Sequence, residues 1–324
     1  MISYQEAIEC IDQAVSSISY PEKPKGLYAP IDYILNLKGK KIRPVLTLLA
    51  CNLYKDLIND AIPSALAWEV FHNFTLMHDD LMDHADIRRS QPTVHKVWDA
   101  NTAILSGDAM LILAYQYMTN SPSGKVKELL DLFSTTAMEI CEGQQYDMDF
   151  EQRLDVSEAE YLEMIRLKTA VMIGACLKSG GIIGGANQED VQHLYDFGIN
   201  FGLAFQIRDD LLDVYGTSEI FGKNIGGDIL CNKKTYLLIR AFEMATGSLK
   251  QELEQWINAA KYDPQEKIRA VTAIYDQLNI RMLCEEKMDS FYSKALRSFD
   301  SVSVSADKKK ILLDLIRLMM KRTV

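Results

Sequence analysis

Apolar residues recur at three- and four-residue spacing along most of this chain, which is the period of a helix with a buried face. Residues 190–214, DVQHLYDFGINFGLAFQIRDDLLDV, show the pattern most clearly, with large apolar side chains at Leu194, Phe197, Phe201 and Phe205 and no proline. A segment so long and so apolar would expose too much hydrophobic surface on the outside of a protein. We therefore predict that it forms a helix that crosses the core.

Interruptions of this pattern are few. The 324 residues include only 17 glycines and 8 prolines, and no segment alternates apolar and polar residues between turn signals, so no strand is predicted. Glycine, proline and polar residues predict breaks at residues 21–30, 120–124, 180–185 and 216–235, none of which is typical of a domain linker. The pattern predicts an all-α protein of roughly ten to fourteen helices that forms one domain over residues 1–324.

Composition narrows the function classes. Hydrophobic residues make up 48% of the chain, enough for a large core, and the net charge of −10 argues against a nucleic acid or an anionic membrane as partner. Six cysteines without a CxxC pair predict reduced thiols rather than a disulfide framework or a zinc site. We see no signal peptide and no apolar run of the ~18 residues that a membrane span needs. A soluble cytoplasmic protein without membrane insertion is expected.

Two segments, FHNFTLMHDDLMD at residues 71–83 and FGLAFQIRDDLLD at residues 201–213, are apolar helices that end in DDxxD. Residues four apart share a helix face, so Asp79 should point with Asp83, and Asp209 with Asp213. Like charges at this spacing repel, and apolar neighbours reduce their screening by water. A solvated acidic face is the alternative, but oxygen ligands beside apolar residues favour Mg²⁺ held together with substrate phosphates.

The aspartate clusters also carry a family resemblance. Residues 79–95, DDLMDHADIRRSQPTVH, resemble the first aspartate-rich motif of the trans-prenyl diphosphate synthases, and FQIRDDLLD at residues 205–213 resembles the second. The other marks of that family follow in the right order: GKKIRP (39–44), GQQYDMDFE (143–151), KTA (168–170) and GKNIGGDILCNKKT (222–235). The resemblance covers about residues 35 to 240 and implies a helical bundle of the isoprenoid synthase type around a central cavity.

This resemblance implies a homodimeric prenyltransferase of the geranylgeranyl or farnesyl diphosphate synthase type. Such an enzyme joins isopentenyl diphosphate to dimethylallyl, geranyl or farnesyl diphosphate by ionisation, condensation and elimination. Three Mg²⁺ ions would bind with the allylic diphosphate at Asp79, Asp83, Asp209 and Asp213. The aspartates would then be metal ligands rather than acid–base catalysts, and with them Lys168 and Lys223 complete the expected catalytic set.

The resemblance also assigns the cationic residues. Arg88 is expected to bind the allylic diphosphate. Isopentenyl diphosphate is expected to bind to Arg89, Lys40, Arg43 and His72. The arginines suit this role because a guanidinium fork can make bidentate contacts to phosphate. His72 could equally be a core histidine, and without the motif that interpretation would be favoured.

A second set matches the contacts of the allylic substrate: Lys168, Thr169, Gln206, Lys223 and Lys233. Their alternative reading is ordinary surface lysines and polar caps. We expect the two lysines of the glycine-broken loop to act as a lid. The Lys168 carbonyl and the polar atoms of Thr169 and Gln206 should stabilise a carbocation as fixed dipoles.

The chain departs from the family pattern at a few positions. Lys38 replaces a usual glycine, Lys41 a usual arginine, and Ser90 stands where glycine is common. Cys231 and Asn232 stand where an acidic residue and a glycine are usual. None of these changes removes a charge that the chemistry requires, so they bear on substrate affinity and on the geometry of the loop.

Product length is predicted from the helix that carries the first motif. Thr75, Phe74 and Phe71 lie four, five and eight residues before Asp79, on the face that a growing prenyl tail would follow. Each turn advances about 5.4 Å, so Phe74 should act as a floor that limits the product to about fifteen to twenty carbons. One aromatic beside a small residue resembles the geranylgeranyl-producing members of the family. The alternative is that Phe71 and Phe74 only pack in the core.

Two other functions share features with this sequence. A terpene cyclase shares the fold and the first motif, but it needs neither the second DDxxD nor cations for isopentenyl diphosphate. A non-catalytic partner subunit would belong to a different class, and such subunits tend to lose an aspartate motif. Both motifs are intact here, which favours the synthase.

Overall fold

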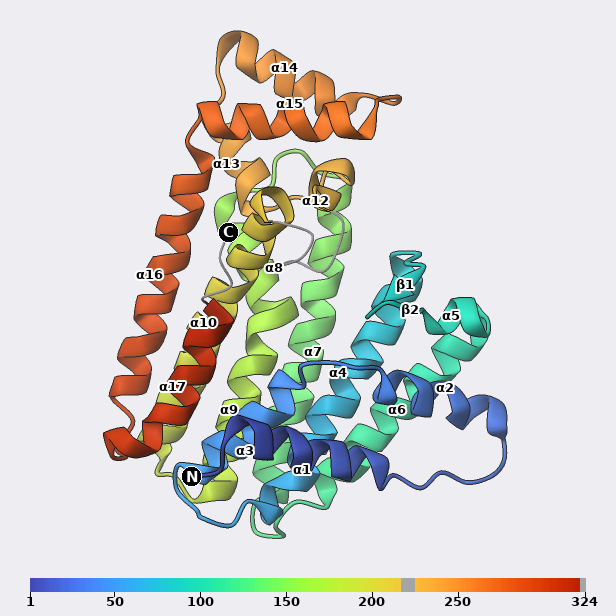
Figure 1. Ribbon diagram of the computed structural model, residues 1–324, viewed down its shortest axis with the longest axis vertical. Helices are drawn as coiled ribbons and strands as arrows, with labels where there is room; N and C mark the ends of the chain where they lie inside the picture. The colour runs from blue at the N-terminus through green and yellow to red at the C-terminus, as the bar shows by residue number, and fades with distance from the viewer. Residues whose placement is uncertain (217–224, 321–324) are drawn as a thin grey trace. The chain divides into compact units, whose positions relative to one another are not determined.

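The computed structural model describes residues 1–216 and 225–320. The chain forms two compact units that interleave along the sequence. The first comprises Met1–Ser134, Ala175–Leu194 and Ser303–Leu313, and the second comprises Thr135–Gly174, Tyr195–Val302 and Asp314–Val324. The prediction of an all-α fold is confirmed (Figure 1). That the whole chain is one domain stays a prediction.

The first unit is built around α4 (Ile62–Met82), which packs against α3 (Ile42–Asn52) and α6 (Ala100–Thr119). Its other elements are α1 (Tyr4–Ser16), α2 (Lys25–Asn36), η1 (Asn59–Ala61), β1 (Ile87–Arg88), β2 (Gln91–Pro92) and α5 (Val94–Val97). Aromatic rings fill its core. The Phe133 ring centroid lies 4.9 Å from that of Trp68 and 5.1 Å from that of Phe71, and the Trp68 indole N–H donates to the Ser179 hydroxyl at 3.0 Å.

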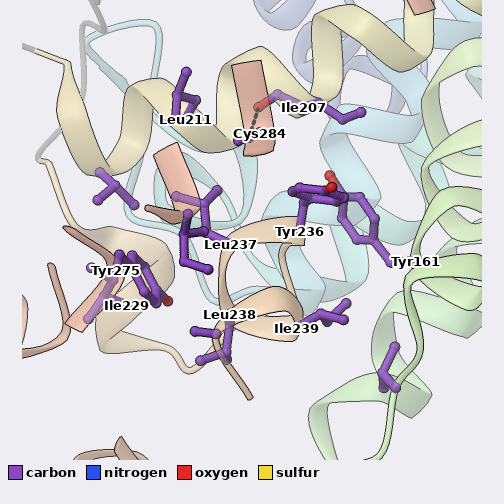
Figure 2. Close-up of a cluster of buried hydrophobic side chains, with 14 of the residues drawn as sticks. Tyr161, Ile207, Leu211, Ile229, Tyr236, Leu237, Leu238, Ile239, Tyr275 and Cys284 are labelled. Carbon is purple, nitrogen blue, oxygen red and sulfur yellow. Dashed lines mark hydrogen bonds between the residues drawn. The ribbon is translucent and has the colours of Figure 1, made fainter. Parts of the chain in front are cut away.

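The second unit contains the long helix α10 (Gln188–Tyr215), whose first residues belong to the first unit. Its other elements are α8 (Glu158–Ile165), η2 (Arg166–Ala170), α12 (Gly227–Leu230), α13 (Tyr236–Met244), α14 (Gly247–Asn258), α15 (Pro264–Gln277) and α16 (Ile280–Asp300). Helices α7 (Val126–Glu151), α9 (Val171–Gly184) and α17 (Ala306–Met320) have residues in both units. Figure 2 shows the hydrophobic core of the second unit, where Tyr161, Leu237 and Tyr275 are buried and the Cys284 thiol donates to the Ile207 carbonyl.

The predicted core helix is confirmed, because Leu194, Phe197 and Phe201 on α10 are fully buried. Small residues let α10 approach α9 closely. A Cβ atom added at Gly198 would lie 2.5 Å from the Gly174 Cα, and one added at Gly202 would lie 2.6 Å from the Ala170 Cα. Gly198 therefore sets the distance between the axes of α10 and α9, and Gly202 sets the distance between α10 and η2.

One predicted break is wrong, and another extends too far along the chain. Helix α9 continues to Gly184, through most of the predicted break at residues 180–185. Its glycines serve close packing, because a Cβ atom at Gly180 would lie 2.2 Å from the Thr47 carbonyl oxygen of α3. Helix α2 begins at Lys25 and includes Pro30, inside the predicted break at residues 21–30, because burial of Pro30, Ile31 and Ile34 on one face outweighs the single lost backbone hydrogen bond.

The absence of strands was also predicted, and one short hairpin corrects it. Strands β1 and β2 pair antiparallel, with Ile87 opposite Pro92 and Arg88 opposite Gln91. The two turn residues, Arg89 and Ser90, have φ of 51° and 62°, as in the tightest hairpin turns. Strands of two residues are too short to show a periodic pattern.

The prediction that no apolar run is long enough for a membrane span is corrected at one stretch of the described residues, because Glu158–Gly184 is long and apolar enough by length and composition. The structure buries 78% of its apolar window within the protein, as expected of a core helix in a folded domain.

The carboxylate of Asp190 offers a test of the packing of the first unit. Burial alone would raise the pKa of Asp190, but the hydroxyl and backbone N–H of Ser303, which donate at 2.6 and 2.7 Å, lower it on balance. A lowered pKa stabilises the fold above the unfolded-state value of about 4, and this contribution is lost as the pH falls through the folded-state value. We expect Asp190→Asn to cost about 1–3 kcal/mol at pH 7 and progressively less in acid.

Denaturant unfolding across pH measures this dependence. Glu252→Gln, at an exposed position of α14, is the control and should change the unfolding free energy by less than about 0.5 kcal/mol. A cost for Asp190→Asn that does not vary with pH would contradict the role of the charge.

Candidate active site

The first aspartate motif lies at the C-terminal end of α4. Asp79 is in the last turn, and Asp83 is the residue after the helix, with its N–H bonded to the Asp79 carbonyl at 2.8 Å. Carbonyl groups that point outward make the C-terminal end of a helix negative, so acidic side chains are disfavoured there. Two carboxylates in this position favour the binding of a cation.

Arg88 of the short hairpin is aimed at this motif. Its Nε lies 2.8 and 2.7 Å from the two carboxylate oxygens of Asp80, and its Nη2 lies 3.8 Å from Asp79. Burial raises the pKa of Asp80, and Arg88 acts against that shift. The sequence analysis did not assign Asp80, although its place in the DDxxD motif was a signal. The carboxylate of Asp80 thus holds the arginine beside Asp79.

The predicted isopentenyl diphosphate residues also meet in the first unit. The Arg43 Nη1 lies 3.1 Å from the His72 Nε2. Burial lowers the pKa of His72 well below its usual value, and Arg43 and Arg89 add to the shift. Since a guanidinium can only donate, the neutral imidazole accepts at Nε2 and carries its proton on Nδ1. His72 is therefore a neutral donor at the centre of a cationic cluster.

Arg89 reaches the segment before α3. Its Nη1 donates to the Leu37 carbonyl at 3.2 Å, and a Cβ atom at Gly39 would lie 2.7 Å from its guanidinium carbon. Lys40 follows in the exposed turn, where its carbonyl accepts from the Tyr4 hydroxyl at 3.3 Å. Glycine at position 39 leaves room for the guanidinium to lie against the backbone.

The sequence analysis missed Glu69. This residue is only 1% exposed, and its Oε1 accepts from the Asn73 amide at 3.0 Å. Burial lowers the pKa of Arg89, while the Glu69 carboxylate acts in the opposite direction. Glu69 therefore supplies a negative charge close to Arg89. The signal was a glutamate inside the apolar run LAWEVF.

The second aspartate motif lies near the C-terminal end of α10 in the second unit. Asp209 is half-buried there. Asp213 is buried, and its Oδ2 accepts from the backbone N–H of Asp228 at 3.0 Å. Its carbonyl accepts from the Gly226 N–H at 2.6 Å. Asp213 thus anchors the start of α12, and Asp209 is the more accessible carboxylate.

A π turn, η2, carries Lys168 and Thr169. A π turn shifts the hydrogen-bond register by one residue and is frequent at functional sites, and the apolar periodicity gave no sign of it. Helix α7 approaches this turn at Gly143, where a Cβ atom would lie 2.3 Å from the Lys168 backbone nitrogen. The Lys168 ammonium donates to Asp147 of α7 at 2.6 Å. Asp147 was within the quoted motif but was not assigned a role.

A hydrogen-bonded chain links this turn to α10. The Thr169 hydroxyl donates to Gln206 at 3.3 Å, the Gln206 amide donates to Asp210 at 3.0 Å, and the Tyr161 hydroxyl donates to Asp210 at 2.6 Å. Burial raises the pKa of Asp210 to about 7, and nearby Asp228 adds to the shift. The predicted pair of Thr169 and Gln206 is therefore brought together.

Lys233 lies near the same acidic groups. Burial alone would raise the pKa of Asp147, but Lys233 and Lys168 outweigh that effect and lower it. Lys233 also acts to lower the pKa of Asp210. Lys223 lies outside the described residues. The structure thus brings together Lys168, Thr169, Gln206 and Lys233 in the second unit.

Two departures from the family pattern coincide with left-handed backbone. Ser90 and Asn232, both at positions where glycine is usual, have φ of 62° and 52°. Glycine adopts this conformation without strain, whereas serine does so only at a cost. Asparagine tolerates it better because its side chain can form local hydrogen bonds.

The three predicted chain-length residues differ in burial. Phe71 is 1% exposed and packs against Trp68 and Phe133, so it belongs to the core of the first unit. Phe74 is half-buried, with its ring centroid 5.6 Å from that of Phe71 and 4.8 Å from that of His78. The Thr75 hydroxyl donates to the His72 carbonyl at 2.8 Å.

No group of three or more His, Cys, Asp or Glu side chains in the described part of the chain is already assembled as a metal cage. Mg²⁺ needs only one or two carboxylates when substrate phosphates and water complete its shell. The carboxylates of Asp79 and Asp83 at the negative end of α4, and that of Asp209 within the last two turns of α10, fit that donor set.

The chain is similar to known prenyl diphosphate synthases. The sequence model of the polyprenyl synthetase family matches residues 24–275. A geranylgeranyl diphosphate synthase of Methanosarcina mazei is 40% identical over 235 residues, which is 72% of each chain. A geranylfarnesyl diphosphate synthase of Natronomonas pharaonis is 40% identical over 73% of this chain and 74% of that protein. A crystal structure of a geranylgeranyl pyrophosphate synthase superposes with a TM-score of 0.95, 43% identity and full coverage of both chains.

The contact between α7 and the π turn can be tested at Gly143. In Gly143→Ala the new methyl group would meet the Lys168 backbone at 2.3 Å, so α7 and the turn must move apart. Because catalytic groups displaced by about 1 Å commonly cost a hundredfold in rate, we expect turnover to fall by about that factor. Steady-state kinetics and a melting curve measure the effect. Gly26→Ala, where a Cβ atom meets nothing within 4 Å, is the control, and normal turnover in Gly143→Ala would contradict this role of the contact.

Proposed function

This chain belongs to the polyprenyl synthetase family and is a prenyltransferase, and we propose that it condenses isopentenyl diphosphate with an allylic diphosphate into a short-chain all-trans prenyl diphosphate. The observation that carries the proposal is that each of two apolar helices ends in paired carboxylates with lysine or arginine side chains close by, Arg88 beside Asp79 and Lys233 near Asp210. A terpene cyclase or a non-catalytic partner subunit receives no support from the relatives.

Isopentenyl diphosphate is assigned to the cationic cluster of the first unit. Arg43 and Arg89 supply planar guanidinium forks, which suit bidentate contacts to phosphate oxygens. His72 donates from Nδ1 as a neutral group, since its Nε2 accepts from Arg43. Lys40, in the exposed turn before α3, adds a fourth donor. The Glu69 carboxylate opposes the lowering of the Arg89 pKa by burial and so favours the protonated guanidinium.

The allylic diphosphate is assigned to Arg88, Lys168, Lys223 and Lys233. Asp147 accepts from Lys168 and thereby fixes its ammonium group beside the π turn. Thr169 and Gln206 present oxygen dipoles next to that turn, where they stabilise the allylic cation. Lys233, and Lys223 outside the described residues, were predicted to act as a lid, and we assign both to closing over the diphosphate.

Asp79, Asp83 and Asp209 are assigned to three Mg²⁺ ions. When bound with the diphosphate, Mg²⁺ neutralises its charge and makes it a better leaving group. Asp213 stays a proposed further ligand, and its Oδ2 also accepts from the backbone N–H of Asp228 at the start of α12.

The reaction then follows without a protein base. The allylic C–O bond breaks, and the double bond of isopentenyl diphosphate attacks the cation, so that a C–C bond forms. The departing pyrophosphate takes the proton that is lost. The part of the protein is to hold the two substrates in line and to exclude water, which would trap the cation as an alcohol.

We propose a homodimer in the cytoplasm. Helix α6 exposes Ile104, Leu105 and Ile112 by 45%, 61% and 61%, an apolar stripe that a second copy would cover. Burial of Glu158–Gly184 within the protein supports a location away from membranes.

The product assay tests the proposed function. Purified enzyme with Mg²⁺, isopentenyl diphosphate and dimethylallyl, geranyl or farnesyl diphosphate should release pyrophosphate and a longer prenyl diphosphate. Asp79→Ala and Asp209→Ala should each lower turnover by about a thousandfold or more, as loss of charge stabilisation does at comparable sites. Near-normal turnover in either variant would contradict the metal assignment, and an inactive wild-type enzyme would contradict the proposal itself.

Product length is tested at Phe74. Its half-buried ring lies one turn before Asp79, so removing it should let the tail grow further, and products should lengthen beyond twenty carbons while turnover stays within a few-fold. Mass spectrometry of the products measures the shift. Phe71→Ala, in the core, should instead cost about 3–5 kcal/mol of stability. Unchanged products from Phe74→Ala would place the floor elsewhere.

Sedimentation velocity measures the oligomeric state. The 36.7 kDa chain should sediment with twice its mass at micromolar concentration. Leu105→Glu on the exposed stripe should give monomers, because it places a charge in an apolar interface. Leu57→Glu, at a position 72% exposed outside α6, is the matched control. A monomeric wild-type protein would contradict the dimer.

A further inference from the structure

Lys267 is a buried lysine that the proposed chemistry does not use. It lies on α15 and is 0% exposed. Its ammonium donates to the Asn232 side-chain oxygen at 2.6 Å and to the Leu230 carbonyl at 3.5 Å, and it sits 4.3 Å above the Tyr262 ring centroid. An ammonium group has three donors and is costly to bury without partners. These contacts therefore offset the cost of burying the Lys267 ammonium group.

Asn232 is the corner of the turn that carries Lys233. Its φ of 52° turns the chain out of α12, and its side-chain amide also donates to the Ile257 carbonyl at the end of α14. The next residue, Lys233, bonds back through its N–H to the Asp228 carbonyl at 2.9 Å. The direction of the Lys233 side chain is thus set by how the Asn232 corner is held.

The pair of helices α14 and α15 holds both ends of α12. At its beginning, a Cβ atom at Gly226 would lie 2.6 Å from the Ile268 side chain of α15. At its end, Tyr262 donates to the Leu230 carbonyl at 3.1 Å, beside the contacts of Lys267. Figure 1 shows α14 and α15 running side by side in the second unit. Lys267 and Ile268 are adjacent, so a single turn of α15 supports the whole of α12.

We propose that Lys267 is a positioning residue that fixes Lys233 toward the allylic diphosphate by holding the side chain of Asn232. The inference rests on the proposed function, in which Lys233 contacts that substrate. Glycine at position 232 would form the left-handed corner without any side-chain support. In this chain asparagine takes the position, and the buried lysine compensates for it. Asn232 and Lys267 should therefore depend on each other.

The test is a double-mutant cycle with the full-length enzyme. Lys267→Met keeps the length of the side chain but removes its donors. We expect it to raise the Michaelis constant for the allylic diphosphate about tenfold, the size of one lost hydrogen bond to a charged group, and to leave that for isopentenyl diphosphate within twofold. In the Asn232→Gly background the same change should raise it less than threefold, because no side chain then needs the lysine.

Lys261→Met, which removes one exposed charge from the loop between α14 and α15, is the matched control and should behave as wild type. In a Lys233→Ala background, Lys267→Met should add no further loss. Equal effects on both substrates, or no relief by Asn232→Gly, would show that Lys267 only supports the fold and would overturn the inference. If the wild-type enzyme were active and Lys267→Met matched it, the inference alone would fail.

Discussion

Carboxylates four residues apart at the end of an apolar helix repel one another, and the negative end of the helix adds to the cost. This constraint applies twice, at the ends of α4 and α10. In each motif the protein itself satisfies the middle aspartate. Arg88 binds Asp80 through both carboxylate oxygens, whereas Asp210 accepts from Tyr161 and Gln206. In the proposed function, the first aspartate of each motif binds a cation that is brought with the substrate.

Two partners of the middle aspartates, Arg88 and Gln206, are also groups that reach the substrates in the proposed reaction. Arg88 can face a diphosphate because Asp80 holds it at the motif, and Gln206 keeps its oxygen toward Thr169 because its amide is committed to Asp210. The contacts that neutralise the acidic helix ends are therefore also the contacts that position the binding groups. Removing the carboxylate of Asp80 or Asp210 would therefore remove a charge and would also displace the side chain that this carboxylate holds.

Backbone geometry supplies the rest of the positioning. The π turn presents Lys168 and Thr169, and only a glycine at position 143 lets α7 come close enough for Asp147 to meet Lys168. The left-handed corners at Arg89, Ser90 and Asn232 direct the hairpin and the Lys233 turn. These strained conformations persist because tertiary contacts hold them, as is common near functional sites.

The sequence by itself determined the helical class, the long core helix at residues 190–214, and the two pairs of carboxylates, because helix periodicity is a local property of the chain. It also pointed to Arg43, His72, Lys168 and Gln206 through motif resemblance. What it could not show were partners distant along the chain: Glu69 close to Arg89, Asp147 on Lys168, and Lys267 beneath Asn232. The glycines at positions 180 and 184 predict a break from sequence alone, because the sequence does not reveal that α3 packs against them. Such features depend on which segments pack together, and only the tertiary structure decides that.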